Sequence, residues 1–317
     1  MSESKEDESI NNHCPGIDSE NAGKSSACSG CPNQQICSSG QSRMPNIEND
    51  LAEISKRLKS IKHIIIVMSG KGGVGKSTVT SQLARYLASD TSINVGVLDL
   101  DICGPSIPKA MGAQNREVVS SYFGWSPIYI EENLSIMSCE FLLESLDDAV
   151  IWRGPKKNAL IKRFLCDVNW GDLDFLLIDT PPGTSDEHLS LTSFLKDCKN
   201  VRGTILVTTP QEIAKMDVRK QIEFCRKVNL PILGYVENMA YFICPECHQH
   251  NQIFHESESN FEEKFRIKLL GKIPIDSIIG KSCDDGESIF QNESLSPQTR
   301  EAFNQIWDNI QNELKTS

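Results

Sequence analysis

The sequence predicts an α/β protein with a mainly parallel sheet and helices on both faces, preceded by a flexible, cysteine-rich arm. Three observations support this prediction. From residue 62 onward, short apolar runs alternate with helix-like segments, which is the pattern of repeated strand–helix–strand units. A glycine-rich stretch separates the first of these strands from the first long helix. Polar residues end several strands, and a parallel sheet binds ligands at the edge where its strands end.

The predicted elements begin after a polar N-terminal arm. Residues 1–55 are rich in Ser, Asn, Gly, Asp and Glu, so they cannot form a packed core of their own. We therefore place the folded domain at 56–317, with a short helix from Asp50 to Lys59 leading into it. The expected strands are His63–Met68, Asn94–Asp101, Leu134–Ser138, Leu173–Asp179, Gly203–Thr209, Leu233–Met239 and Leu269–Pro274, and the expected helices are Lys76–Ala88, Asn158–Cys166, Ile213–Val228 and Gln298–Leu314.

Composition narrows the class of protein. The 317 residues are enough to bury a substantial core, and no run approaches the roughly 20 apolar residues that span a membrane. The acidic start, MSESKEDE, lacks the apolar segment of a signal peptide. A net charge of −11 argues against non-specific binding to nucleic acid, which needs a basic surface. We expect a soluble intracellular protein that binds neither membrane nor nucleic acid.

The glycine-rich stretch predicts a phosphate site. It fits the pattern G-x-x-x-x-G-K-[ST] and lies between a predicted strand and a helix N-terminus. Glycines let several backbone N–H groups converge on one anion, and the helix dipole adds positive potential. Lys76 is expected to reach the outer phosphates, and the Ser77 hydroxyl to bind Mg²⁺. The predicted nucleotide-binding residues of this P-loop are Gly70, Lys71, Gly72, Gly73, Val74, Gly75, Lys76, Ser77 and Thr78.

Acidic residues at two further strand ends complete a predicted nucleotide site. Asp179 ends an apolar strand and could hold Mg²⁺ through water, and Gly183 could approach a γ-phosphate through its N–H. Asp99 and Asp101 stand two apart, so their side chains face the same side and could point towards the metal and the attacking water. The alternative is that these are solvated acids in surface loops.

The loop and its neighbours resemble the MinD/nitrogenase-iron-protein class of P-loop ATPases, and the Mrp subgroup within it. The resemblance runs over about residues 62–290. It implies an enzyme that hydrolyses ATP with Mg²⁺, in which Lys71 reaches across a dimer to the partner's phosphates. It further implies that Asp101 positions the water and that Asn238 reads the adenine. The similar segments are Lys71–Thr78, Asp99–Ser106, Trp152–Pro155, Asp179–Glu187 and Glu237–Met239.

Six of the 12 cysteines form two groups that predict metal binding. In a reducing compartment, clustered cysteines more often bind metal than form disulfides. The first group has the spacing C-x13-C-x2-C-x5-C, which suits a [4Fe–4S] cluster or zinc. In the second, a CPEC segment supplies two thiolates and needs two more ligands, either from a symmetry-related copy or from His248 and His250 in a zinc site. The groups are Cys14, Cys28, Cys31 and Cys37, and Cys244 and Cys247.

The remaining six cysteines are expected to be structural, because buried free cysteine behaves as a small hydrophobe. Cys103 lies in the segment after Asp101, and we interpret it as a packing residue as well.

The arm spacing ahead of this ATPase closely resembles the larger, arm-bearing type of cytosolic iron–sulfur assembly scaffold. The resemblance implies a stable [4Fe–4S] cluster on the arm and a labile one bridging two chains through Cys244 and Cys247. It also implies cluster transfer to cytosolic and nuclear apo-proteins, and a heterotetramer with a shorter paralogue that lacks the arm, or pairing with a second copy. The expected location is the cytoplasm, with the nucleus as a second option.

The sequence leaves three alternatives open. One is a spatial-organiser, partition or targeting ATPase of the MinD type, with a structural zinc CxxC at its dimer interface. The second is a zinc-bound structural ATPase without a cluster role, and the third is an electron-transfer protein like the nitrogenase iron protein.

Overall fold

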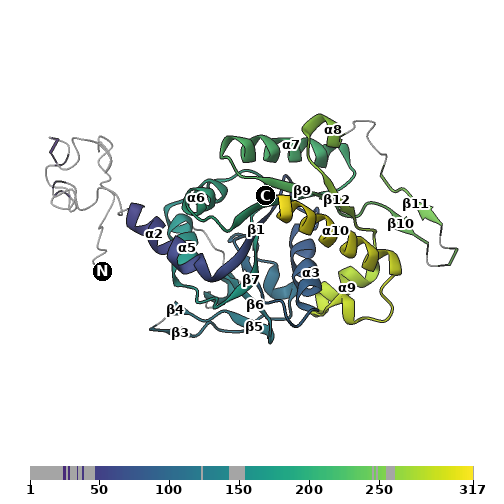
Figure 1. Ribbon diagram of the computed structural model, residues 1–317, viewed down its shortest axis with the longest axis horizontal. Helices are drawn as coiled ribbons and strands as arrows, with labels where there is room; N and C mark the ends of the chain where they lie inside the picture. The colour runs from purple at the N-terminus through teal and green to yellow at the C-terminus, as the bar shows by residue number, and fades with distance from the viewer. Residues whose placement is uncertain are drawn as a thin grey trace, which may run out of the picture. The chain divides into compact units, whose positions relative to one another are not determined.

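The computed structural model describes residues 24, 25, 28, 34 and 38, and residues 47–316 apart from 123, 143–153, 245, 248 and 255–260 (Figure 1). The chain divides between Glu53 and Ile54 into two units, a boundary that lies inside helix α2 (Ile47–Arg57). The second unit contains the whole main sheet. Most of the predicted arm lies outside the described residues, so the division into 1–55 and 56–317 stays a prediction.

An eight-stranded sheet forms the centre of the second unit, in the order β12-β9-β8-β1-β7-β2-β6-β5. Every neighbouring pair is parallel except β5 and β6, so the sheet is mainly parallel as predicted. The strands are β1 (Ile61–Ser69), β2 (Val95–Asp99), β5 (Ile128–Glu131), β6 (Leu134–Ser138), β7 (Leu173–Asp179), β8 (Val201–Thr208), β9 (Ile232–Glu237) and β12 (Leu269–Lys272).

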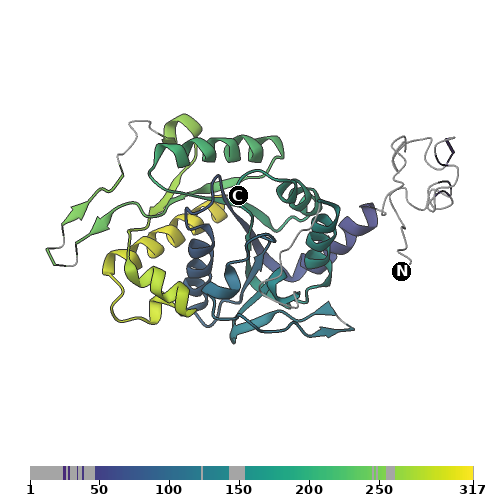
Figure 2. The same cartoon turned by 180° about the vertical axis from the view of Figure 1, so that it is seen from behind.

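Helices cover both faces of this sheet (Figures 1 and 2). Helix α3 (Lys76–Ala88) and the C-terminal helix α10 (Pro297–Thr316) pack on one face, and α7 (Glu212–Lys227) contacts β1 and β8 from the other. Helices α5 (Gly154–Asp167) and α6 (Asp186–Leu195) pack together beside α7. The shorter helices are α4 (Ile107–Ala110), α8 (Phe261–Phe265) and α9 (Ser277–Asp285), with 3₁₀ turns η2 (Leu58–Ser60), η3 (Cys139–Leu142) and η4 (Ile289–Gln291).

Burial on both faces explains the continuous apolar strands. In β1, every residue from Ile64 to Ser69 is buried, because helices cover the strand on each side. The neighbouring strands β7 and β2 are equally apolar, and their register aligns Asp99 with Asp179 at the carboxyl edge of the sheet. The sequence pattern therefore predicts the fold correctly and brings the polar strand ends to one edge.

Elements with weak sequence signals were missed. The edge strand β5 and the helices α6 and α9 were not predicted, and neither were the hairpins β3 (Ser120–Ser121) with β4 (Gly124–Trp125) and β10 (Phe242–Ile243) with β11 (His250–Asn251). These elements are short or amphipathic only in part, so neither period 2 nor period 3.6 stands out. Within the described residues, no helix combines the length and the apolar character that crossing a membrane requires.

Candidate functional site

The P-loop joins β1 to α3 at the carboxyl edge of the sheet. Gly73 and Gly75 have φ of +80° and +81°, a conformation that glycine adopts without strain. A Cβ on Gly75 would lie 2.2 Å from Asn238 Nδ2, so side-chain packing also requires glycine there. The loop borders a cavity of about 230 Å³. Its lining includes all nine predicted positions except Gly70, together with Ser69, Asp101, Ser106 and Pro182.

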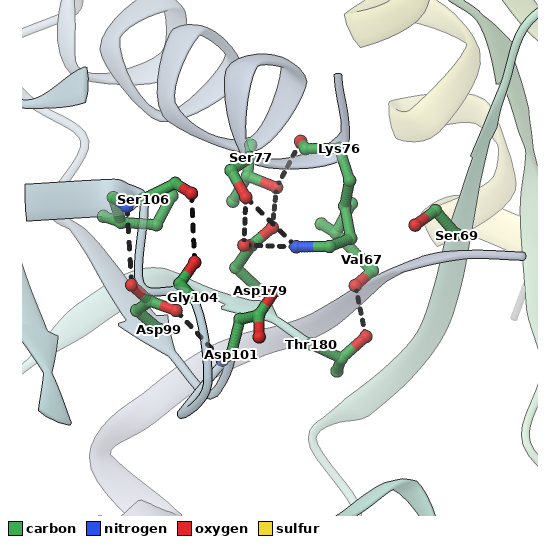
Figure 3. Close-up of polar contacts among 12 residues, drawn as sticks. Val67, Ser69, Lys76, Ser77, Asp99, Asp101, Gly104, Ser106, Asp179 and Thr180 are labelled. Atoms are coloured by element: carbon green, nitrogen blue, oxygen red, sulfur yellow. Dashed lines mark hydrogen bonds and ion pairs between the residues drawn. The ribbon is translucent and has the colours of Figure 1, made fainter. Parts of the chain in front are cut away.

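A buried polar network lies at the start of α3 (Figure 3). Lys76 pairs with Asp179 Oδ2, and the Ser77 hydroxyl donates to the same oxygen at 2.7 Å. The Thr80 hydroxyl donates to the other carboxylate oxygen of Asp179 at 2.6 Å. Asp179 is fully buried and Lys76 is 6% exposed, so each charge depends on its partners. The structure thus brings the predicted phosphate lysine and both predicted Mg²⁺ residues into direct contact.

Asp99 and Asp101 have different surroundings, although they are two residues apart. Asp99 is fully buried, and its carboxylate accepts the backbone N–H of Asp101 at 3.0 Å and that of Ile107 at 3.4 Å. Burial and the nearby Asp179 carboxylate raise the pKa of Asp99 to about 8. Asp101 lies beyond the end of β2 and lines the cavity (Figure 3), and burial raises its pKa too. Asp99 therefore shapes the loop that presents Asp101.

The segment after Asp179 is held by a histidine that sequence reasoning missed. The His188 ring accepts the Ser185 N–H at Nδ1 (3.2 Å), and its Nε2 lies 3.1 Å from the Thr180 hydroxyl. The Thr180 hydroxyl uses its only proton to donate to the carbonyl of Val67 in β1 at 2.9 Å. It therefore accepts from His188, which is the neutral tautomer with its proton on Nε2. Burial lowers the pKa of His188 to about 4. The available signal was the capping spacing, because Ser185 is the N-cap of α6 and His188 occupies position N3.

Gly183 contacts the end of β1, just before the P-loop, and Asn238 contacts the P-loop itself. The Gly183 N–H donates to the carbonyl of Ser69 at 2.8 Å, with φ of +79°. The Asn238 side chain is buried and donates from Nδ2 to the carbonyl of Val74 at 2.9 Å. Both residues lie beside the loop, as predicted, while their contacts with a γ-phosphate and with adenine stay predictions.

Lys71 is exposed at the start of the loop. An exposed lysine beside the phosphate cavity has the access that a contact with a second chain requires. The assignment of Lys71 to a partner's nucleotide is likewise a prediction.

The CPEC segment connects β10 and β11, in a hairpin that extends from the sheet (Figure 1). Backbone N–H groups of Cys247 and Glu246 hydrogen-bond Cys244 and lower the pKa of its thiol, which favours the thiolate that binds metals. Cys244 is half-buried and Cys247 is exposed. Among the described residues, no group of three or more His, Cys, Asp or Glu side chains could hold a metal ion. The His250 ring stacks on Tyr241, and His248 lies outside the described residues.

The arm cysteines are mostly outside the described part of the chain. Cys28 is buried, and its Sγ lies 3.2 Å from the Ser25 hydroxyl. Cys14, Cys31 and Cys37 lie outside the described residues, and so do Trp152 and Arg153 of the segment before α5. The four-cysteine cluster site therefore stays a prediction.

One isolated cysteine contradicts our interpretation. Cys103 is exposed, so it is not a packing residue, and its Sγ lies 3.1 Å from the Lys157 ammonium. The error has a physical cause, because Cys103 lies in the irregular segment between β2 and α4, where Ile102 is buried but Cys103 and the next residue, Gly104, are exposed. The predicted burial is confirmed for Cys139, Cys166, Cys198 and Cys225, whereas Cys283 is half-buried.

Fold and site together define a P-loop NTPase with a second lysine in its loop. The chain belongs to the family described as ParA, NUBPL iron-transfer P-loop NTPase, which it matches over residues 60–311. The prediction of a P-loop ATPase of the Mrp/MinD class is thereby confirmed.

Solved structures support the assignment. The chain is similar to a nucleotide-binding protein from Archaeoglobus fulgidus in complex with ADP, with 38% identity, 80% of this chain and 96% of that chain covered, and a TM-score of 0.66. The cell division ATPase MinD from Pyrococcus furiosus is 22% identical, covering 79% and 99%, with a TM-score of 0.56. MinD from Pyrococcus horikoshii, complexed with Mg-ADP, is also 22% identical, covering 78% and 95%, with a TM-score of 0.56. At these identities MinD shows the fold alone.

Proposed function

We propose that this chain is an ATP-dependent scaffold that assembles [4Fe–4S] clusters and transfers them to cytosolic and nuclear apo-proteins. The observation that carries the proposal is the cysteine pair on the β10–β11 hairpin. Its thiols are accessible, backbone N–H groups favour the thiolate of Cys244, and the described part of one chain supplies no third ligand beside them. Two copies meeting at this hairpin would offer four thiolates, the number that a [4Fe–4S] cluster takes.

The short connection between the hairpin and the nucleotide site supports coupling to ATP. Asn238 donates to the P-loop at Val74, and Cys244 follows Asn238 by six residues. The intervening backbone is bonded to the segment after β12. The Ala240 N–H donates to the Ile273 carbonyl at 2.8 Å, and the Ile275 N–H donates to the Tyr241 carbonyl at 2.7 Å. A nucleotide that repositions Asn238 would therefore also move the hairpin, which gives the two sites different contacts in the two nucleotide states.

The hydrolytic roles follow from positions around the cavity. Lys76 would exchange Asp179 for the outer phosphates, and Ser77 and Asp179 would hold Mg²⁺. Asp101 would position the attacking water from the cavity wall. Lys71 would neutralise charge on a partner's nucleotide, so hydrolysis would require a dimer. Gly183 would sense the γ-phosphate by exchanging its bond to Ser69.

The arm would hold a second, stable [4Fe–4S] cluster on Cys14, Cys28, Cys31 and Cys37, whose spacing supports it. The partner would be a shorter paralogue in a heterotetramer, or a second copy of this chain. The proposed place of action is the cytoplasm, and the nucleus as a second compartment. The family description as an iron-transfer NTPase fits these roles.

The decisive experiment is anaerobic reconstitution of the full chain with iron and sulfide. We expect brown protein with broad absorption near ~400 nm, iron and sulfide in equal amounts, and less bound iron in a Cys244→Ser variant. Colourless protein with stoichiometric zinc at both cysteine groups would contradict the scaffold function. That result would favour the MinD-type alternative with a structural zinc between two chains.

A further inference from the structure

A lysine at the start of α5 lies between the segment that follows Asp101 and the segment that follows Gly183. Lys157 Nζ is 2.6 Å from Glu187 Oε1 and 3.1 Å from Cys103 Sγ. Cys103 follows the predicted water-positioning Asp101 by two residues, and Glu187 follows Gly183 by four. The lysine thus contacts the loop after the predicted water-positioning residue and the helix after the predicted γ-phosphate-binding residue.

The environment gives these contacts more strength than an exposed ion pair has. The Glu187 side chain is 9% exposed and that of Lys157 is 20% exposed, so solvent screens their attraction only in part. The hydrogen bond to Glu187 raises the pKa of Lys157, and the hydrogen bond to Cys103 raises it further. Burial is the largest influence on Glu187 and opposes its ionisation, but the hydrogen bonds from Lys157, Ser185 and the backbone, together with the charge of Lys157, lower the pKa of that carboxyl. Both groups are therefore charged at neutral pH.

Helix stability does not explain the position of this lysine. Helix α5 begins at Gly154, so Lys157 lies in its first turn, where the helix dipole disfavours a cation. Glu187 lies in the first turn of α6, where an anion is already favourable without a partner. What the lysine adds is a bond from α5 both to α6 and to the loop that contains Cys103.

We propose that Lys157 is a positioning residue for nucleotide hydrolysis, because it ties the loop that presents Asp101 to the helix that follows Gly183. Hydrolysis needs the water-positioning acid and the γ-phosphate-sensing backbone in place at the same moment, and small displacements of either are costly. A cation that bonds both segments holds them at a fixed separation. This inference rests on the hydrolytic part of the proposed function, and it is independent of any iron–sulfur cluster.

The test is steady-state ATP hydrolysis by the full chain, with the variants Lys157→Met, Lys157→Arg and the neighbouring control Lys156→Met. Lys156 is exposed on the same helix turn, so its loss removes a positive charge without removing the link. We expect kcat to fall about tenfold or more in Lys157→Met, as for the loss of a charge-assisted hydrogen bond, with KM within about twofold. Lys157→Arg should recover most of the rate, and Lys156→Met should match the wild type.

A second variant distinguishes loss of the link from loss of folding. Cys103 is exposed, so Cys103→Ala should fold normally, and it removes one end of the link. We expect its kcat to fall about threefold at unchanged thermal stability, as for one weak hydrogen bond, while Cys103→Ser retains the acceptor and the rate.

Two outcomes would contradict the inference. One is an active wild type whose kcat is unchanged in Lys157→Met and Cys103→Ala. The other is a Lys157→Met defect that Lys157→Arg does not rescue and that matches its loss of thermal stability. A wild type with no ATP hydrolysis would instead overturn the proposed function itself.

Discussion

The nucleotide site and the cysteine hairpin are built in opposite ways. At the nucleotide site, a fully buried Asp179 binds Lys76, Ser77 and Thr80, so both its carboxylate oxygens have partners. On the hairpin, Cys247 is exposed, and the described residues provide no third metal ligand. The first site has its polar groups satisfied within one chain, whereas the second presents thiols that still need partners.

This difference separates what one chain can do from what two chains do together. Nucleotide binding needs residues that a single chain already holds in place. Metal binding at the hairpin, and hydrolysis if Lys71 acts on a partner, would both depend on assembly. The following predictions test that separation, from the largest expected effect to the smallest.

Replacement of Lys71 with Ala should lower kcat by about 10³-fold, the range seen when a charge supplied in trans is removed from phosphoryl transfer. Nucleotide affinity should change little, because Lys71 is exposed and the buried network around Lys76 stays intact. The measurements are steady-state hydrolysis and fluorescent-nucleotide titration.

Mixing Lys71→Ala chains with Lys76→Ala chains should restore part of the activity. In such a mixed dimer, the first chain supplies Lys76 and the second supplies Lys71 to one shared site. Unchanged turnover in Lys71→Ala would contradict a role in trans.

Replacement of Cys244 or Cys247 with Ser should abolish the metal shared by two chains and leave nucleotide affinity unchanged. The half-buried Cys283 provides the matched control, because it is also a free thiol and lies on α9, away from the hairpin. Iron content and mass by light scattering, measured with and without reconstitution, report both effects. If Cys244→Ser chains keep a full complement of metal, the hairpin is not the shared site.

The same contrast explains what the sequence could predict. Buried parallel strands and the P-loop leave strong local signals. From these signals the sequence predicts every strand of the sheet except β5, the helix α3, and the placement of Lys76 and Asp179 at one edge of the sheet. Asp99 was grouped with Asp101 by strand alternation, but the chain leaves the strand at Asp99, so only Asp101 lines the cavity. Lys157 contacts Glu187 and Cys103 through tertiary structure, and no spacing rule places a lysine of α5 beside Cys103. The only local signal for His188 was its capping position in α6.

Acid should destabilise the nucleotide half of the molecule through His188. The folded-state pKa is about 4, below the ordinary value of 6.5, so the unfolded chain binds the extra proton first as pH falls. The stability contribution is therefore complete above about pH 6.5 and is lost as pH falls towards 4, by about 3 kcal/mol at most. Urea unfolding at several pH values measures it.

His188→Gln should flatten this part of the pH dependence, because glutamine can hydrogen-bond but does not titrate in this range. His250 on the hairpin is exposed, so His250→Gln serves as the control and should leave the pH dependence unchanged. An equal slope in wild type and His188→Gln would show that another group is responsible.

Asn238 connects the two regions, so its replacement gives the smallest and most specific effect. Asn238→Ala removes the bond to the Val74 carbonyl and should cost about 1 kcal/mol of stability. If Asn238 also reads the adenine, ATP affinity should fall about tenfold and discrimination against GTP should weaken.

The coupling between the two regions can be measured as the rate at which an alkylating reagent modifies Cys247 on the hairpin, followed by mass spectrometry. In the wild type, a saturating non-hydrolysable ATP analogue should change the alkylation rate of Cys247. In Asn238→Ala, the same analogue at saturation should leave that rate unchanged. Asn251→Ala, an exposed hairpin change, is the control. A response that survives in Asn238→Ala would mean that nucleotide binding reaches the cysteines by another route, and the two regions would be coupled through α7 or β12 instead.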